Sequence, residues 1–253
     1  MPMEELEYIS IENQTVDFPK HYHETFCISL IHQGIEQIEF GNHSLFSEMG
    51  SISIANPFEI HSNPIIGTKI PLNFDTIYLS KDLMKYASKG KNISFLTRKI
   101  NSLEANGLFM KLKNAIDTRD SFLIESALVR FVEILQEFSL ESDSEFQGLE
   151  FNKFQKINQY IENNIQEKFC LEDLSKLANI NKFGFAKQFK ESIGMAPMNY
   201  ILMKKIFASK KLIGPDAELT EIAYHYNFTD LAHFSKTFKR FVGISPKAYR
   251  ESL

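Results

Sequence analysis

Short segments that alternate apolar and polar residues fill much of the first eighty positions of the chain. Four of them stand out, at residues 26–32, 35–40, 51–55 and 72–79. They are rich in strand-forming residues and are separated by glycine, proline and asparagine, which are typical of turns. The pattern predicts short strands arranged as a sandwich or a barrel. We expect seven apolar residues to form the barrel core or the wall of its pocket: Phe26, Ile28, Leu30, Ile38, Phe40, Ile52 and Ile54.

From Ser80 onward the apolar residues recur with helical spacing. Ser80 is a good N-cap residue and is followed by an acidic residue in the first turn. A narrow apolar stripe then covers residues 109–116, and a much broader one covers residues 122–138. The broad stripe predicts a helix that buries much of its surface, either within the chain or against a second copy of it.

Helical periodicity is lost in the polar stretch at residues 139–148 and returns after residue 150. We therefore expect an α+β protein with a linker between an N-terminal part and an all-helical C-terminal part. The predicted boundaries are a barrel at 1–95, connecting or dimerisation helices at 96–142, a linker at 143–150 and a helical domain at 151–253.

The charge of the chain divides at the same place. The net charge is −4, but residues 150–253 carry 16 basic and 11 acidic side chains, whereas residues 1–149 carry 12 and 21. A basic domain joined to an acidic one indicates two domains with different partners. The hydrophobic content of 43% is typical of globular proteins, and no apolar run reaches the ~20 residues of a membrane span. An acidic start without a signal sequence and only two cysteines predict a cytoplasmic protein without a membrane partner.

The C-terminal part contains an internal repeat. Residues 189–200 and 238–249 both read Phe-Lys-x-x-x-Gly-x-x-Pro-x-x-Tyr, and the segments before them are also similar. Each copy predicts a helix, a tight turn and a second helix, at about 171–192 and 219–241. Asn179 and Asn227 fall at the turns, where the left-handed conformation is often needed. Asn181 and Thr229 are the expected caps of the helices that follow.

Two helix–turn–helix copies favour a DNA-binding function, because the second helix of this motif enters the major groove. A phenylalanine pair spaced by four residues predicts the buried face of each second helix, at Phe185 and Phe189 and at Phe234 and Phe238. The residues around these pairs, most of them polar, are the expected DNA-binding set: Lys182, Phe183, Ala186, Lys187, Lys190, Thr229, Ala232, His233, Lys236, Lys239 and Arg240. The segment 198–213 predicts a helix that joins the copies. A protein-binding helical repeat is the alternative, although such repeats usually stack at least three units.

Residues from about 151 to 253 resemble the DNA-binding domain of the AraC/XylS transcription regulators. The second copy carries most of the signature: Ile222, Ala223, Phe228, Phe234, Ser235, Phe238, Lys239, Gly243, Pro246 and Tyr249. The resemblance implies two helix–turn–helix units joined by a helix that bind asymmetric promoter sites. It also implies that four positions face bases or phosphates: Phe183, Lys187, Ala232 and Lys236. The chain departs from the family at Asn227, Lys205 and Ser209, where glycine, arginine and alanine are common.

The N-terminal part resembles the cupin barrels that are often fused to such domains. The resemblance is carried by His21, His23, Glu24, His61 and the glycines and proline between them. Residues two apart on a strand point to the same side, so His21 and His23 are expected to share a face, and His61 follows a turn that allows it to converge with them. The candidate effector-binding residues are His21, His23, Glu24, His61 and Tyr78.

Three converging histidines are also candidate ligands for Zn²⁺ or Fe²⁺. Cupin enzymes add a glutamate a few residues later, but that position lies near Ile28, and the side chain of Glu24 should point away from His23. No other catalytic motif is present. We therefore expect no enzyme, no cofactor and no metal, with the histidines binding a polar effector. They could also lie at the rim of the barrel or pair with acidic neighbours.

The sequence thus predicts a ligand-responsive bacterial transcription regulator, an activator or a repressor. Its expected partners are promoter DNA, a small-molecule effector, a second copy of the chain and RNA polymerase. Two alternatives stay open. One is a metal-dependent cupin enzyme with a helical appendage. The other is a regulator that responds to a protein partner and has an empty barrel.

Overall fold

The computed structural model describes residues 6–67, 70–141 and 154–253. The chain divides into two compact units, one of residues 1–17 and 22–148 and the other of residues 18–21 and 149–253. The short strand at 18–21 is described here with the N-terminal sheets, into which it is hydrogen-bonded. The linker predicted at 143–150 lies outside the described residues.

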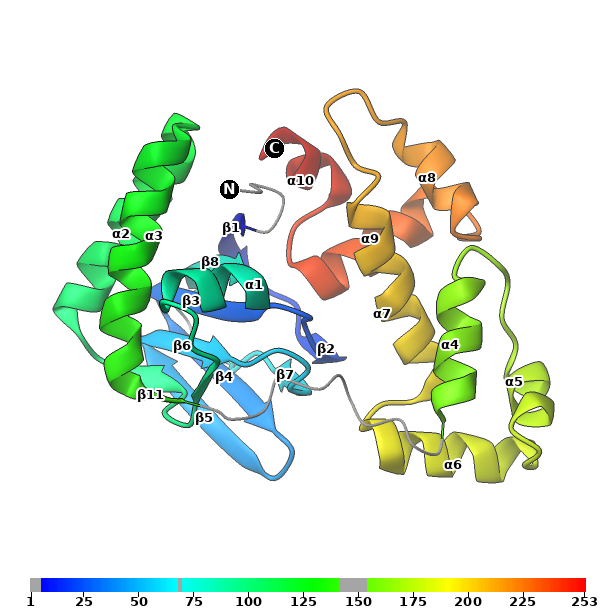
Figure 1. The fold of residues 1–253 in the computed structure, drawn as a ribbon. Coiled ribbons are helices and arrows are strands. Elements are labelled where there is room, and N and C mark those ends of the chain that lie inside the picture. The colour runs from blue at the N-terminus through cyan, green and yellow to red at the C-terminus, as the bar shows by residue number, and fades with distance from the viewer. Residues whose placement is uncertain (1–5, 68–69, 142–153) are drawn as a thin grey trace. The chain divides into compact units, whose positions relative to one another are not determined.

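Two sheets form the barrel of the N-terminal unit (Figure 1). The five-stranded antiparallel sheet has the order β1 (Leu6–Gln14), β8 (Leu72–Leu79), β3 (Phe26–Gln33), β6 (Ile52–Ala55) and β10 (Lys99–Ile100). The four-stranded sheet has the order β2 (Phe18–His21), β7 (His61–Asn63), β4 (Ile35–Phe40) and β5 (His43–Glu48). A further pair joins β9 (Ile93–Phe95) and β11 (Ser139–Glu141). The four strands that the alternating pattern predicted are β3, β4, β6 and β8, and all four are confirmed.

The turn between β3 and β4 depends on Gly34. This residue has a φ of +82°, and a Cβ atom at this position would lie 2.8 Å from the carbonyl oxygen of Pro71. Only glycine combines the positive φ with so close an approach of another backbone. The turn sets the start of β4, and with it the positions of the side chains that β4 presents to the other sheet.

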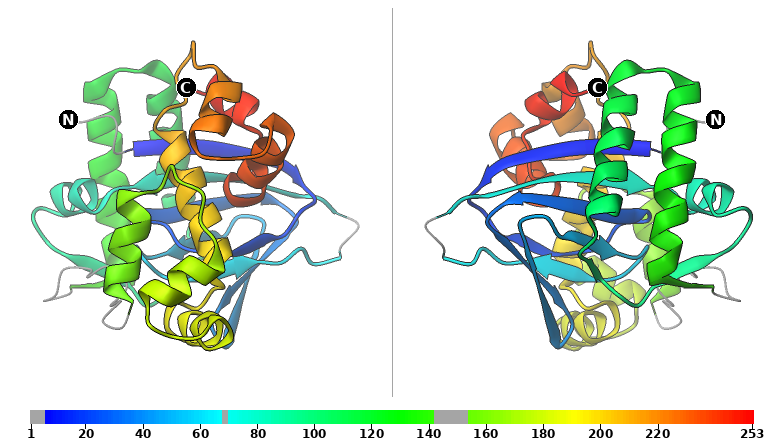
Figure 2. Two further views of the ribbon diagram at one scale, coloured as in Figure 1. Left: turned by 90° about the vertical axis from the view of Figure 1, so that its right-hand side faces the viewer. Right: turned by 90° about the vertical axis from the view of Figure 1, so that its left-hand side faces the viewer.

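Three helices cover one face of the five-stranded sheet, as Figure 2 shows for the hairpin of two long helices. They are α1 (Lys81–Ala87), α2 (Leu103–Thr118) and α3 (Ser121–Leu135), which is followed by the 3₁₀ turn η2 (Gln136–Phe138). Phe109 of α2 and Phe131 of α3 meet edge to face with ring centroids 5.7 Å apart. Ser80 caps α1 as predicted, because its hydroxyl accepts a hydrogen bond from the Leu83 amide.

The main apolar cluster of this unit lies between the sheet and the helices. Five of the residues expected in the barrel core belong to this cluster: Phe26, Ile28, Leu30, Ile52 and Ile54. They occupy alternate positions of β3 and β6, so they all point to the helix side of the sheet. These five residues are buried as expected, but the expectation that they line the inside of the barrel is wrong, because they pack against α1, α2 and α3.

Seven helices lie in the part of the C-terminal unit that the structure describes. They are α4 (Gln155–Asn163), α5 (Leu171–Leu177), α6 (Lys182–Ile193), α7 (Pro197–Lys210), α8 (Leu219–His225), α9 (Leu231–Val242) and α10 (Pro246–Glu251). The helix pairs α5–α6 and α8–α9 are the two predicted helix–turn–helix copies, and α7 is the predicted joining helix. Among the described residues, no helix combines the length and apolar character needed to span a bilayer.

The turns inside the two copies use asparagine as predicted. Asn179 has a φ of 55° and Asn227 a φ of 57°, so both adopt the left-handed conformation. Asn181 caps α6, since its side-chain oxygen accepts a hydrogen bond from the Gly184 amide at 2.9 Å. The predicted cap at Thr229 is wrong by one residue. Asp230 caps α9 by accepting from the His233 amide at 2.7 Å, because a carboxylate offers a stronger acceptor than the neighbouring hydroxyl.

Candidate DNA-binding surface and effector site

Helix α6 buries one face and exposes the other. Phe185 and Phe189 are fully buried, as the sequence predicted. The predicted DNA-binding residues Lys182, Phe183, Lys187 and Lys190 are all exposed, and Ala186 is half-buried. Among the described large apolar residues of this unit, Phe183 has the highest exposed fraction, at 84%. Lys182 is ion-paired with Glu172 of α5, and the Nζ of Lys187 lies 4.0 Å from Glu191.

Helix α9 repeats this arrangement in the second copy. Phe234 and Phe238 are fully buried, with ring centroids 5.7 Å apart. All six predicted DNA-binding residues of this copy are exposed: Thr229, Ala232, His233, Lys236, Lys239 and Arg240. The hydroxyl of Thr229 lies 3.0 Å from Nδ1 of His233, so these two side chains hold each other at the start of the helix. Three of the six are cationic, and such side chains bind phosphates and guanine edges.

A buried lysine of α7 connects the two copies. Lys205 is only 5% exposed, and its Nζ donates to the carbonyl oxygens of Glu167 and Tyr226 at 2.7 Å each. Glu167 lies in the segment between α4 and α5, and Tyr226 directly follows α8, so one ammonium group joins the segment before the first helix–turn–helix unit to the turn of the second. Burial lowers the pKa of Lys205 to about 8. From the sequence, Lys205 was expected to depart from the arginine common in the family, but its two backbone partners were not predicted. An apolar joining helix with a lysine on its inner face was the available signal.

The face of the five-stranded sheet turned away from the helices is polar. It carries Cys27, Ser29, Ser53, Thr76 and Tyr78, at the positions that alternate with the apolar cluster. The hydroxyl oxygens of Ser29 and Thr76 lie 2.8 Å apart on neighbouring strands. This face therefore offers hydrogen-bonding groups to the inside of the barrel.

Glu36 brings a carboxyl group from the opposite sheet to this polar face. Its Oε2 accepts a hydrogen bond from Ser53 at 2.6 Å, and its Oε1 accepts one from Asn63 at 3.0 Å. The Ser53 bond crosses between the two sheets, which places Glu36 inside the barrel. Burial raises the pKa of Glu36 to about 7. Glu36 was not predicted as a site residue, although it lies two positions from Ile38 in β4 and so shares the face of a residue expected to be buried.

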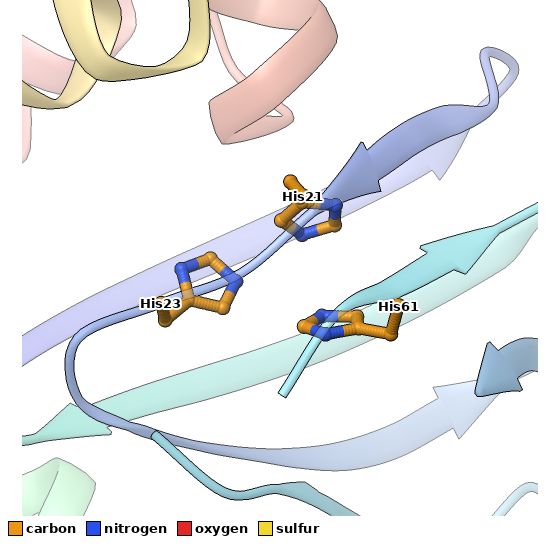
Figure 3. Close-up of side chains that lie close together, drawn as sticks. All are labelled: His21, His23 and His61. Atoms are coloured by element: carbon orange, nitrogen blue, oxygen red, sulfur yellow. The ribbon is translucent and has the colours of Figure 1, made fainter. Parts of the chain in front are cut away.

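The histidines His21, His23 and His61 converge as their spacing predicted (Figure 3). One ring nitrogen from each lies within 4.8 Å of those of the other two. The ring centroids of His23 and His61 are 5.4 Å apart, and those of His23 and Tyr78 are 4.9 Å apart. Burial lowers the pKa of His61 to about 4 and raises that of the Tyr78 hydroxyl. Glu24, the fifth candidate, is exposed.

Comparison with known proteins identifies both units. A model named "AraC-like ligand binding domain" matches residues 5–130, and one named "Helix-turn-helix domain" matches residues 174–252. The chain is 26% identical to the probable transcriptional regulator LumQ of Photobacterium leiognathi over 251 residues, which cover 97% of this chain and 98% of LumQ. It is 22% identical to the transcriptional activator RhaS of Citrobacter koseri over 247 residues, covering 92% and 88%.

The fold is also similar to a solved structure. ToxT from Vibrio cholerae O395 superposes with a TM-score of 0.57 at 16% identity, over 99% of this chain and 98% of that one. At this level of identity the comparison concerns the fold, and it extends over both units. Together the matches cover the barrel, the connecting helices and the paired helix–turn–helix units.

Proposed function

Since the chain belongs to the AraC family of transcription regulators, we propose that α6 and α9 are the helices that read its promoter DNA. One observation carries this assignment. Each helix buries a phenylalanine pair against its own unit, and ten of the eleven side chains predicted to contact DNA are exposed around these pairs. Exposed Lys and Arg side chains on two such helices suit successive segments of the major groove. The place of action is then the cytoplasm, where bacterial promoters lie.

Charge reversal in the reading helices tests the assignment. A promoter fragment selected for binding by the unmodified protein is titrated at several salt concentrations with Lys187→Glu and Lys236→Glu. We expect each variant to lose ~1–3 kcal/mol of binding free energy for a lost base contact. The matched control is Lys111→Glu, the same change at an exposed residue of α2. If both test variants bind as tightly as the control, α6 and α9 are not the reading helices.

We further propose that the polar interior of the barrel binds a small-molecule effector. The groups available to it are the carboxyl of Glu36, the hydroxyls of Ser29 and Thr76, and the rings of His23 and His61. ToxT has been crystallised with an unsaturated fatty acid. In the barrel of this chain, the buried carboxyl of Glu36 disfavours an anionic group beside it. The interior therefore favours a small polar compound that donates hydrogen bonds. A thermal-shift screen identifies it, because a ligand that binds the folded state raises the unfolding temperature.

The effector acts by binding one arrangement of the protein better than another. We propose that this preference changes how the DNA-binding unit binds the promoter, and with it the use of the promoter by RNA polymerase. RhaS, a similar protein, is named a transcriptional activator, which supports this proposal. Transcription in vitro with purified polymerase, with and without the screened ligand, measures the direction of the effect. Equal transcript levels under both conditions would contradict effector control.

Helix α3 supports a homodimer. Its apolar stripe is largely buried against the sheet, but Phe122 and Leu123 at its start are 76% and 47% exposed. We propose that a second copy covers these residues. Phe122→Asp should shift the protein from dimer to monomer in sedimentation equilibrium. The control is Leu103→Asp, which should leave the dimer intact, because Leu103 lies at the start of α2 and is 92% exposed. A dimer that persists in Phe122→Asp would exclude this surface.

We propose no catalytic activity for the barrel. The similar proteins LumQ and RhaS are named regulators, and the carboxyl that the barrel contributes, Glu36, is hydrogen-bonded to Ser53 and Asn63.

A further inference from the structure

The segment between α4 and α5 meets the turn of the second helix–turn–helix copy, and Figure 1 shows this segment reaching the end of α8. The side-chain amide of Asn227, in that turn, donates to the carbonyl oxygen of Gln166 at 2.6 Å. The neighbouring residues Glu167 and Tyr226 both accept from Nζ of Lys205, at 2.7 Å each. Three hydrogen bonds therefore join the segment that leads into the first copy to the turn of the second. We call these five residues the joint.

The joint lies just before the parts of the chain that set the positions of α6 and α9. Gln166 and Glu167 shortly precede α5, which packs against α6. Phe228, directly after the turn, packs against Phe234 of α9 with ring centroids 5.2 Å apart. A movement at the joint would therefore change the angle between α6 and α9.

Hydrogen bonds fix this angle in a way that apolar packing cannot. Helix α7 packs against both α6 and α9, but apolar contacts are non-directional and permit small rotations. Hydrogen bonds weaken steeply when they are bent. Lys205 is only 5% exposed, and its Nζ lies 5.5 Å from the centre of the Phe169 ring. Because a buried charge without hydrogen-bond partners is costly, Lys205 holds the carbonyls of Glu167 and Tyr226 in place.

The side chain of Asn227 does more than form a turn. Its φ of 57° is left-handed, and glycine adopts this conformation without strain, but glycine has no side chain to reach Gln166. The corresponding turn of the first copy has Asn179, with a φ of 55°. Among the described residues, the side chain of Asn179 makes no hydrogen bond to the other copy. Comparing the two asparagines therefore separates the contribution of the joint from that of the turn.

We propose that Lys205 and Asn227 are positioning residues that fix the angle between α6 and α9, and with it the spacing between the two parts of the promoter site. The effect on spacing rests on the proposal that α6 and α9 read the DNA. Successive segments of the major groove are about 34 Å apart, and one inserted base pair turns one segment by about 34° relative to the other. Helices held at a fixed angle cannot follow this turn, whereas helices that rotate relative to each other can.

The first experiment measures binding to the selected promoter fragment, and to the same fragment with one base pair inserted between the two footprinted segments. We expect the insertion to weaken binding of the unmodified chain more than about 10-fold, as for the loss of one good base contact. In Asn227→Gly and Lys205→Met the loss should be under about 3-fold, because the joint no longer opposes the rotation. Lys205→Arg should keep the full loss, since a guanidinium has donors for both carbonyls.

The second experiment follows the angle without DNA, by double electron–electron resonance. Spin labels are placed at Lys190→Cys of α6 and Lys239→Cys of α9, which are exposed and equivalent positions of the two copies. The full-length chain is used, with Cys27 and Cys170 replaced by serine. We expect one narrow distribution of distances between the labels in this parent chain, and a broader one after Asn227→Gly.

Asn179→Gly is the matched control, and it should change neither the distance distribution nor the effect of the insertion. Asn227→Gly removes one exposed hydrogen bond, so it remains a fair test even if Lys205→Met does not fold. An equally narrow distribution in the folded Asn227→Gly protein would overturn the proposal, as would equal broadening in Asn179→Gly. If the distribution broadens only in Asn227→Gly but the insertion affects none of the proteins, the joint fixes the angle as proposed, and the assignment of α6 and α9 as reading helices is wrong.

Discussion

The buried carboxyl of Glu36 should make the barrel less stable as the pH rises. Burial raises its pKa from 4.5 to about 7 in the folded chain, so the folded state holds its proton longer than the unfolded state does. The stability that this group contributes is complete below pH 4.5 and is lost as the pH passes through 7. At 1.36 kcal/mol for each pKa unit, the shift corresponds to about 3 kcal/mol.

Glu36→Gln isolates this contribution. The amide keeps the size of the side chain, and it can accept from Asn63 and donate to Ser53. Because the glutamine cannot ionise, the variant does not lose stability when the pH rises from 4.5 to above 7. Its stability relative to the unmodified chain should therefore rise by roughly 2–3 kcal/mol between pH 5 and pH 8.

Hydrogen exchange measured by mass spectrometry places the effect in the barrel. Peptides that cover β4 report the free energy of local opening, and comparing the two proteins at each pH cancels the pH dependence of exchange itself. Glu12→Gln, at an exposed position of β1, controls for the loss of a negative charge. If the difference between Glu36→Gln and the unmodified chain is the same at pH 5 and pH 8, Glu36 does not titrate as its burial requires.

Three further changes probe other parts of the fold. Lys205→Met should destabilise the C-terminal unit by about 1–3 kcal/mol in calorimetry, because the carbonyls of Glu167 and Tyr226 lose their donor; an unchanged transition would contradict that role. Asn179→Ala should cost about 1–2 kcal/mol in thermal unfolding, whereas Asn179→Gly should cost little, since only the alanine is strained at a φ of 55°. Phe109→Ala should cost about 3–5 kcal/mol in urea unfolding of the N-terminal unit, and a cost below 1 kcal/mol would show that the packing against Phe131 contributes little.

Features set by neighbouring residues could be predicted from the sequence. The phenylalanine pairs of α6 and α9 and the left-handed turns at Asn179 and Asn227 depend on local spacing, and all appear as predicted. Seven of the described strands were not predicted: β1, β2, β5, β7, β9, β10 and β11. Among the shortest of these are β7 and β10. They have three and two residues, so their conformation is set by the strands they pair with rather than by their own pattern.

The candidate site shows the same division. The convergence of His21, His23 and His61 followed from a spacing of two and a turn. The position of Glu36 did not, because it depends on a contact with Ser53 across two sheets. The direction of Phe26 and its neighbours was mistaken because alternation identifies two faces of a strand but not which layer covers each of them.

The separation of the two faces of the five-stranded sheet also bears on how this protein can evolve. Residues of the apolar cluster hold the sheet to α1, α2 and α3, and the residues between them face the inside of the barrel. Replacing Ser29, Thr76 or Cys27 by another residue of similar size changes the ligand chemistry without opening a cavity against the helices. The same scaffold can thus acquire specificity for a new signal through a few substitutions, each made where the fold depends on it least.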